Sequence, residues 1–312
     1  PSFPGRRSKY YYSTDKGATW TFITDVPSVR SGFPSISGFE DGSALVANHS
    51  NVGKAYKDLG SGLGGFTELD APGNRGYIWP RAVATNGLSL TNKFVFVGSI
   101  SGYDTTRWNT CTDVNATPGT WLGWTTIPSS PAETYSIARG TDGRIGMAFK
   151  NNDSLQPNDY ADVWFIESTN NGTSFSAPLK IFDANFSTDS LGLIRGISMV
   201  YKGNAPCVAF ETVKQTQTRT FFPAAPAAIR FWSNTLPGSD PNRSVIIADT
   251  NRVGWHPYVG VNDVLSSLGR PNIGVSADGN ALFVAFMVPS DFAGGVDTTV
   301  FSDIWLSASQ DG

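Results

Sequence analysis

Arginine, glutamate and tyrosine side chains of this sequence stand where they could bind and act on a polar or anionic substrate. Three arginines lie near the start of predicted strands, and they are Arg81, Arg195 and Arg270. Glu211 follows an apolar run, and Tyr258 lies in an aromatic loop. Guanidinium groups bind carboxylates through paired hydrogen bonds, and tyrosine is a nucleophile candidate by residue type. The alternative for the arginines is that they are ordinary loop residues. For Glu211 the sequence leaves two places open, one beside Arg230 in the channel of the domain and the other at a solvated strand end.

A second candidate site is the aromatic loop formed by Trp255, His256 and Tyr258 around Pro257. Aromatic loops of this kind stack on sugar rings, so these residues are candidates for binding a glycan. The same side chains also fill gaps between packed sheets, and the sequence leaves both roles open.

Metal and cofactor sites are not predicted. His49 and His256 are the only histidines, and neither has neighbours at ligand spacing. The turn at 151–153 offers oxygen atoms of the kind that calcium binds, but it lacks EF-hand spacing. Motifs for nucleotides and for serine hydrolases are also absent.

The elements that must position these residues are predicted to be β-strands. Of the 312 residues, 33 are Gly and 19 are Pro, and both residue types interrupt helices and separate short strands. Aromatic residues, which favour strands, make up 12% of the chain. The net charge of −3 and the absence of basic runs argue against a nucleic-acid partner. No apolar run has the roughly 18 residues that a membrane span needs.

An internal repeat gives the order of these strands. Each copy has one strand, an Asp-Gly or similar turn, and a second strand with an ending such as Val-Ala-Phe. The clearest copy covers 271–286. We take five positions as equivalent, with spacings of 46, 55, 60 and 76 residues: Ile36, Ala82, Ile137, Ile197 and Ile273. These spacings fit four-stranded antiparallel sheets with loops of variable length.

A second motif follows the predicted third strands. It has the form S-x-D-x-G-x-T-W, is complete once, is degenerate once with Asn and Phe, and begins a third time at the end of the sequence. Its residues are Ser13, Asp15, Gly17 and Trp20, then Ser168, Asn170, Gly172 and Phe175, and finally Ser309 and Asp311. Asp or Asn in such a turn accepts hydrogen bonds from nearby backbone N–H groups.

This motif resembles the Asp-box, or BNR, repeat of sialidases and many other secreted β-propellers. The resemblance implies a turn between the third and fourth strands of a blade, with Asp15 bonded to backbone N–H groups and Trp20 buried. In sialidases, three arginines bind the substrate carboxylate, a Tyr–Glu pair is the nucleophile and an Asp is the acid/base. Those enzymes usually carry an Arg-Ile-Pro element, which this sequence lacks.

The repeats predict one β-propeller domain over residues 1–312, with six four-stranded blades, or alternatively five. An isolated hairpin at 9–12 and 19–22 and a last blade without its fourth strand indicate a ring that is incomplete at one or both ends. Further residues, the N-terminal hairpin or a neighbouring chain would then cover the open edges.

For function, the leading expectation is a non-catalytic propeller, secreted or at the cell surface, that binds a glycan or a surface protein. The alternatives are an exo-acting glycoside hydrolase of the sialidase type and a structural component of an extracellular assembly. The missing Arg-Ile-Pro element is the reason why catalysis is ranked second.

Overall fold

The computed structural model describes most of the chain, in segments separated by short gaps. The described residues are 5–74, 76–85, 93–100, 105–127, 130, 133–152, 160–185, 190–215, 225–238, 240, 243–253, 268–289 and 302–310. The chain forms two compact units. The first comprises Pro1–Glu133, Thr141–Ile145 and Glu167–Ser176, and the second comprises Thr134–Gly140, Gly146–Ile166 and Ala177–Gly312.

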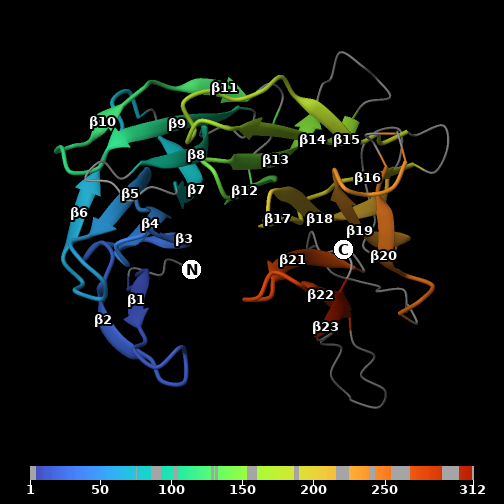
Figure 1. Cartoon of the computed structure of the whole chain (residues 1–312), viewed down its shortest axis with the longest axis horizontal. Coiled ribbons are helices and arrows are strands. Elements are labelled where there is room, and N and C mark those ends of the chain that lie inside the picture. Colours follow the sequence, from blue (N-terminus) through green and yellow to red (C-terminus); the bar gives the residue numbers. More distant parts are fainter. Residues whose placement is uncertain are drawn as a thin grey trace. The chain divides into compact units, whose positions relative to one another are not determined.

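The first unit contains three antiparallel sheets whose strands follow the chain order closely (Figure 1). The first is the hairpin of β1 (Lys9–Tyr12) and β2 (Thr21–Asp25). The second contains β3 (Gly32–Gly38), β4 (Ala44–His49), β5 (Gly53–Asp58) and β6 (Phe66–Leu69). The third contains β7 (Tyr77–Ala84), β8 (Phe94–Ile100) and β9 (Thr106–Asp113), with β10 (Thr120–Trp121) and β11 (Thr125–Ile127) both paired to β9.

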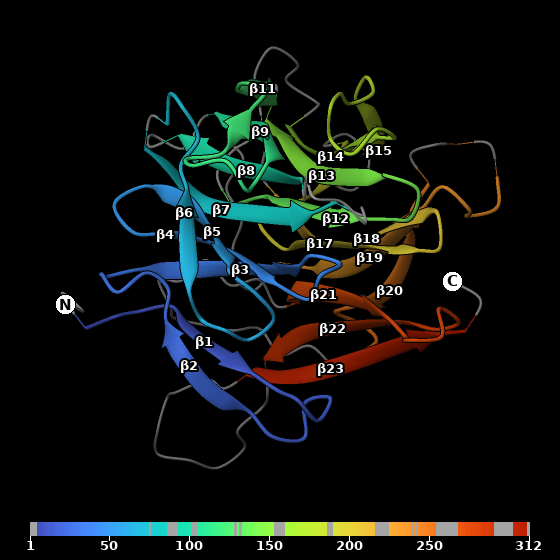
Figure 2. The same ribbon diagram turned by 60° about the vertical axis from the view of Figure 1, so that its left-hand side comes forward.

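The strands of the second unit repeat this order (Figure 2). One sheet contains β12 (Tyr135–Arg139), β13 (Ile145–Asn152), β14 (Tyr160–Ser168) and β15 (Leu179–Phe182). The segments Thr141–Ile145, between β12 and β13, and Glu167–Ser176, between β14 and β15, belong to the first unit. The next contains β16 (Leu191–Gly192) and β17 (Ile197–Lys202), both paired to β18 (Ala205–Lys214), followed by β19 (Ala227–Ser233) and β20 (Val245–Asp249). The last contains β21 (Gly269–Val275), β22 (Leu282–Pro289) and β23 (Ser302–Ser309).

The all-β prediction is confirmed for the described residues, whose regular elements are all strands in antiparallel sheets. Meander sheets of this kind are the blades of β-propellers. The number of blades and the closure of a ring stay predictions. Within the described segments there is no helix that is long and apolar enough to cross a membrane.

The second strands β4, β8 and β18 are buried on both faces, as their continuous apolar sequences predicted, whereas β22 alternates and its Phe283 is 37% exposed. Nearly every residue of β4, β8 and β18 is buried. Cys207, in β18, is a buried free thiol, as predicted for a core residue. Cys111 was expected in a polar loop, but it is a buried residue of β9, where it belongs to an apolar core cluster of the first unit.

Serine hydroxyls connect the first strands of neighbouring sheets within each unit. In the first unit, the backbone N–H of Ala82 donates to Ser35 Oγ at 3.4 Å, and that of Ala84 donates to Ser37 Oγ at 3.0 Å. In the second unit, a first-strand serine again accepts the N–H of the next first strand. These bonds are Met199 N–H to Ser136 Oγ at 3.1 Å and Ile273 N–H to Ser198 Oγ at 3.2 Å.

The strand register corrects one predicted equivalence. Met199, not Ile197, occupies the position of Ile273, because Met199 pairs with Val208 and Ile273 pairs with Val284, each the first residue of a Val-Ala-Phe run. The sequence could not distinguish the two residues, since side chains two apart along a strand point to the same face.

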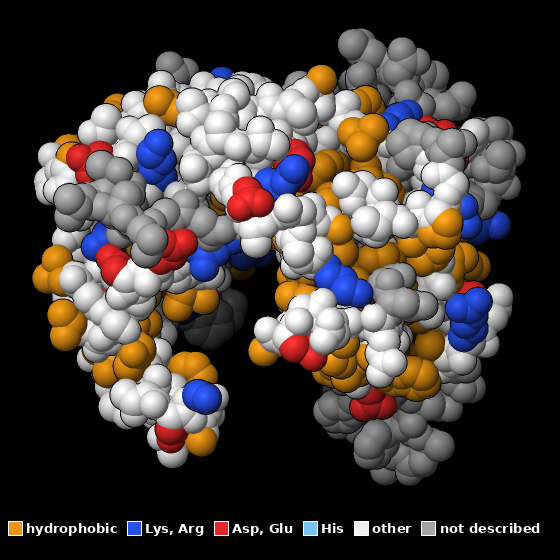
Figure 3. Space-filling model, in the orientation of Figure 1, with side chains coloured by type: hydrophobic (Ala, Val, Ile, Leu, Met, Phe, Trp, Pro, Cys, Tyr) orange, Lys and Arg blue, Asp and Glu red, His pale blue; other side chains and the backbone are white. Residues whose placement is uncertain are grey.

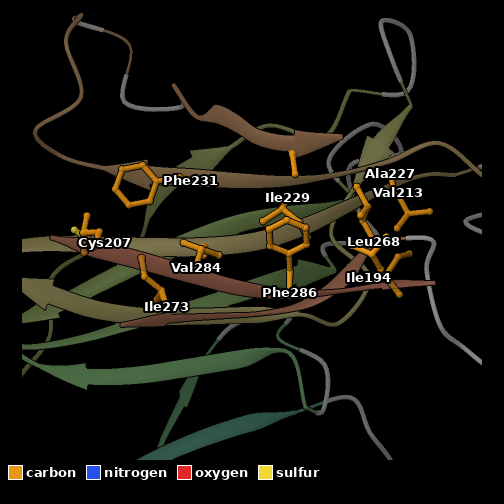
Figure 4. Close-up of a cluster of buried hydrophobic side chains, with 14 residues drawn as sticks. Ile194, Cys207, Val213, Ala227, Ile229, Phe231, Leu268, Ile273, Val284 and Phe286 are labelled. Atoms are coloured by element: carbon orange, nitrogen blue, oxygen red, sulfur yellow. The ribbon is translucent and has the colours of Figure 1, made fainter. Parts of the chain in front are cut away.

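Apolar side chains from neighbouring sheets form the cores. In the second unit, sheets β17–β20 and β21–β23 share one cluster, part of which is shown in Figure 4. Ile229 of β19 and Phe286 of β22 are buried in it. Each sheet therefore depends on its neighbour to cover a face, as expected for stacked β-sheets.

Two turns with the S-x-[D/N]-x-G motif have the same hydrogen-bond network. Thr19 N–H donates to Asp15 Oδ1 at 2.8 Å, and Gly17 N–H donates to Ser13 Oγ at 2.8 Å. In the second turn, Ser174 N–H donates to Asn170 Oδ1 at 3.0 Å, and Gly172 N–H donates to Ser168 Oγ at 2.9 Å. The hydrogen bonding expected of Asp15 is therefore present.

The prediction that Trp20 is buried is wrong, because its side chain is 63% exposed. The indole N–H donates to Gly17 O at 3.1 Å, so the ring lies against its own turn rather than in a core. By contrast, Phe175 of the second turn packs on Trp108 of β9, with ring centroids 4.6 Å apart.

The hydrogen bonds to Asp15 predict a pH dependence of stability. The Thr19 hydroxyl and N–H and the Ser13 hydroxyl lower the pKa of Asp15 from 3.8 to about 2. A carboxylate with a lowered pKa stabilises the folded state above its unfolded pKa, and the effect is lost as the pH falls from about 4 toward 2. We expect Asp15→Asn to fold normally, since Asn170 forms the same hydrogen bonds in the second turn. Between about pH 5 and pH 2 the melting temperature of this variant should fall less than that of the wild type. Equal losses for both proteins would contradict this assignment.

The contact between the second turn and β8 gives a stability prediction. Gly172 has a φ of +76°, and an added Cβ would collide with Val95. We expect Gly172→Ala to lower the free energy of unfolding by about 1–3 kcal/mol more than Gly17→Ala does. Gly17 is the matched control, because its φ is +92° but the nearest atom to an added Cβ is 3.7 Å away. Chemical denaturation of both variants measures the difference, and equal costs would show that the Val95 contact is irrelevant.

Candidate functional site

Three first strands begin with the same irregularity. The register shifts between Gly32 and Ser35 in β3, between Ile78 and Arg81 in β7, and between Gly269 and Asn272 in β21. At each shift a non-glycine residue with positive φ precedes a proline, and these residues are Phe33 (+53°), Trp79 (+48°) and Arg270 (+50°). Such conformations cost roughly 1–3 kcal/mol and concentrate at functional sites, and bulges redirect side chains. The strand starts are therefore the candidate site.

In the first unit, the two bulges bring aromatic rings together. The Phe33 ring lies 6.2 Å from that of Trp79 and 6.3 Å from that of His49, at the end of β4. The Arg6 guanidinium lies 5.3 Å from the Phe33 ring centroid, which is a cation–π distance. Phe33 is 47% exposed, so one face of this cluster is open to a ligand.

His49 is held in its neutral form. Burial lowers its pKa from the usual 6.5, and the positive charges of Arg6 and Arg30 lower it further. A neutral imidazole at pH 7 can donate one hydrogen bond and accept another, which suits sugar hydroxyl groups.

Glu133 adds a carboxyl group just before β12. It is half-buried and has a φ of +63°. Like Phe33 and Trp79, it is a non-glycine residue with a left-handed backbone conformation at the beginning of a first strand.

In the second unit, the candidate site is organised by Glu211. Its side chain, on β18, is 4% exposed. Glu211 Oε1 accepts the backbone N–H of Arg195 at 3.0 Å, and Oε2 accepts that of Arg270 at 2.7 Å. One carboxylate thus fixes the backbone at the start of two neighbouring sheets and holds Arg270 in its strained conformation.

The residue beside this carboxylate has to be glycine. A Cβ on Gly196 would lie 2.5 Å from Glu211 Oε2 and 2.9 Å from Arg270 N. Any side chain here would displace the carboxylate from the two N–H groups.

The structure brings together three of the five catalytic candidates. Arg195 is half-buried, Arg270 is exposed, and both are joined to Glu211 through backbone N–H groups. The alternative that Glu211 is a solvated strand end is wrong, because its side chain is buried and its carboxylate accepts two backbone N–H groups. Arg230 donates to Thr212 Oγ1 at 3.1 Å.

The remaining candidates are not part of this cluster. Arg81 is an exposed residue of β7 in the first unit, two residues after Trp79. Ser309 is the last residue of β23. Four candidates lie outside the described residues, and they are Trp255, His256, Tyr258 and Asp311.

Sequence reasoning missed Phe33, Trp79 and Glu133. For the first two a signal existed, because each precedes the proline that opens a repeat, as Arg270 does. A residue before proline normally takes an extended conformation, so the positive φ itself could not be predicted.

Metal ligands do not gather in the described residues, where no group of three or more His, Cys, Asp or Glu side chains could hold a metal ion.

No family model matches the sequence, and no curated protein is significantly similar to it. Solved structures give distant likenesses. The alpha-L-arabinanase of Penicillium chrysogenum, complexed with arabinobiose, is 11% identical over 96% of this chain and 82% of its own, with a TM-score of 0.49. The alpha-L-arabinofuranosidase of Fusarium graminearum is 11% identical over 96% and 97%, with a TM-score of 0.47. That of Lactobacillus brevis is 11% identical over 88% and 89%, with a TM-score of 0.44.

The structures named here are an arabinanase and two arabinofuranosidases, and the leading expectation of a non-catalytic binding protein is withdrawn in favour of the hydrolase alternative. The ranking of catalysis below binding rested on one absent tripeptide, and a glycoside hydrolase does not need that tripeptide to hold its substrate. Likenesses this distant identify neither the acting residues nor the substrate, so these have to be inferred from the chain itself.

The Glu211 cluster gives the third prediction. In Glu211→Gln the amide oxygen can accept one backbone N–H, but the amide NH2 faces the second N–H, which loses its acceptor. We expect the free energy of unfolding to fall by about 1–3 kcal/mol, the cost of a buried donor without a partner. Glu40→Gln is the control, because Glu40 lies in an exposed turn. Equal stability of the two variants in a denaturant titration would show that Glu211 does not hold the two N–H groups.

Proposed function

We propose that this chain is a glycoside hydrolase that binds its substrate at the starts of the first strands. The observation that supports this is the pair of proline-linked bulges of the first unit, which hold Phe33 and Trp79 at positive φ. Aromatic rings stack on the apolar faces of sugars, and guanidinium groups bind sugar hydroxyls and carboxylates. The first unit offers both, because the Arg6 guanidinium lies 5.3 Å from the centroid of the Phe33 ring.

Hydrolysis requires carboxyl groups, because the leaving oxygen must be protonated while positive charge develops on the sugar. In this proposal Glu133, a half-buried carboxyl group just before β12, donates that proton as the glycosidic C–O bond breaks. Water then bonds to the sugar carbon, and the proton that the water releases restores the acid form of Glu133. Glu211 is a positioning residue, because both of its oxygens accept backbone N–H groups.

The resemblance to Asp-box proteins remains part of this proposal. It is supported by the matching hydrogen bonds of the two turns at 13–20 and 168–175. Because many Asp-box propellers are secreted, we propose that the enzyme acts outside the cytoplasm or at the cell surface. A closed ring of blades belongs to the same proposal.

The test is hydrolysis of a panel of nitrophenyl pentosides, hexosides, uronides and an α-sialoside by the purified chain. We expect turnover of at least one glycoside, and a loss of about 10²–10⁴-fold in kcat for Glu133→Gln, the usual contribution of a general acid. Phe33→Ala should raise KM more than it lowers kcat, because the ring binds rather than reacts. Glu40→Gln is the matched control. No turnover of any glycoside by folded protein, or turnover that survives Glu133→Gln, would overturn the proposal.

A further inference from the structure

In the first unit, the short segment that precedes β1 is bonded to the segment that leads into β3. The backbone N–H of Ser31 donates to Arg6 O at 3.1 Å, and that of Ser8 donates to Ser31 Oγ at 2.8 Å. Both serines are buried, so water does not compete for these hydrogen bonds. The segment is therefore attached next to the bulge that holds Phe33, and Arg6 is brought to that bulge.

The guanidinium of Arg6 is held in one orientation by three contacts. Its Nε donates to Ser31 O at 3.2 Å, and its Cζ lies 5.3 Å from the centroid of the Phe33 ring. It also lies against the backbone of Gly32, where an added Cβ would be 2.9 Å from both Cζ and Nε of Arg6. A planar group that is positioned in advance loses little conformational freedom when it binds a ligand.

The two terminal nitrogens of this guanidinium have no partner in the described part of the chain. The side-chain hydrogen bond of Arg6 uses Nε alone, and none of the ion pairs among the described residues includes Arg6. The residue is also exposed. Unpaired guanidinium N–H groups bind carboxylates and similar oxyanions through two parallel hydrogen bonds, so Arg6 offers a prepared site for an anion.

A second positive charge acts at the same place. Arg30 is exposed, and it forms no ion pair with a described residue. Both Arg6 and Arg30 lower the pKa of His49, whose ring lies 6.3 Å from that of Phe33. Lys and Arg side chains reach the surface of the first unit (Figure 3). The exposed Phe33 ring therefore lies in a region of positive charge, which attracts anions.

We propose that the first unit binds a sugar that carries an oxyanion, either a carboxylate or a sulfate ester, with the oxyanion on Arg6 and the apolar face of the sugar ring on Phe33. Arg30 adds attraction at longer range. The inference rests on the proposed function, because it names the class of glycan that the hydrolase takes. A neutral sugar can also stack on Phe33, but it gains nothing from the two unpaired charges.

Binding is measured without hydrolysis, by NMR titration of the full chain with a methyl galacturonide, a sulfated methyl galactoside and the neutral methyl galactoside. His49 is one of only two histidines in the sequence, so its imidazole signals can be followed. At least one anionic sugar should bind about tenfold more tightly than the neutral one, and the tighter of the two identifies the oxyanion. The bound anion should also raise the pKa of His49, because it offsets the positive charges.

Two variants test the position of the guanidinium without removing its charge. Gly32→Ala should displace Arg6 from Ser31 O and weaken binding of the anionic sugar about tenfold, with little effect on the neutral one. Gly38→Ala, on the same strand, is the matched control, because an added Cβ there has no atom within 4 Å. Arg6→Lys should weaken binding to a similar extent, because an ammonium group cannot form the paired hydrogen bonds.

Arg6→Lys keeps the test decisive even if Gly32→Ala folds poorly. Equal affinity for the anionic and neutral sugars, no binding of any of them, or anion binding that Arg6→Lys leaves unchanged would overturn the inference. The proposed function fails in a different way. A chain that binds an anionic sugar but hydrolyses no glycoside would contradict the hydrolase and not this site, whereas hydrolysis without any preference for anionic sugars would contradict this site and not the hydrolase.

Discussion

The backbone N–H groups of the first strands impose the constraint on which the other features depend. Each first strand pairs with a second strand on one side only, so the N–H groups on its other side need acceptors when they are buried. Serine hydroxyls of the preceding first strand provide them, as Ser37 does for Ala84 and Ser136 does for Met199. These bonds fix the spacing of neighbouring sheets within each unit, and the apolar cores then fill the space between the sheets.

The candidate site uses the point where this regular arrangement is interrupted. At the strand starts the pairing slips by a bulge, and the freed N–H of Arg270 is satisfied by a carboxylate instead of a hydroxyl. A carboxylate accepts stronger hydrogen bonds than a hydroxyl, which is how Glu211 can hold a strained residue in place. The same interruption in the first unit places Phe33 and Trp79. Strain at these positions is stabilised by the packed sheets behind them.

The outer edges of the sheets follow a different rule. The turn at 168–175 places the Phe175 ring against Trp108 of a neighbouring sheet, whereas Trp20 of the turn at 13–20 lies against its own turn. Phe175 and Gly172 show how closely such a segment fits, since the Thr110 hydroxyl donates to Gly172 O at 2.5 Å. On β23, the side chains of Ile304 and Leu306 are 69% and 65% exposed.

The sequence by itself determined the strands, the order of the repeats and the hydrogen bonds of the two turns. All of these depend on residues close together in the chain: alternating apolar residues, Asp-Gly turns, and Asp15 within four residues of its donor Thr19. The exposure of Trp20, the equivalence of Met199 and the role of Glu211 were decided by the tertiary structure. The last two depend on a partner far away in the sequence, such as the N–H of Arg270, 59 residues from Glu211. Local patterns specify which backbone groups need partners, but only the packed sheets decide which distant atoms satisfy them.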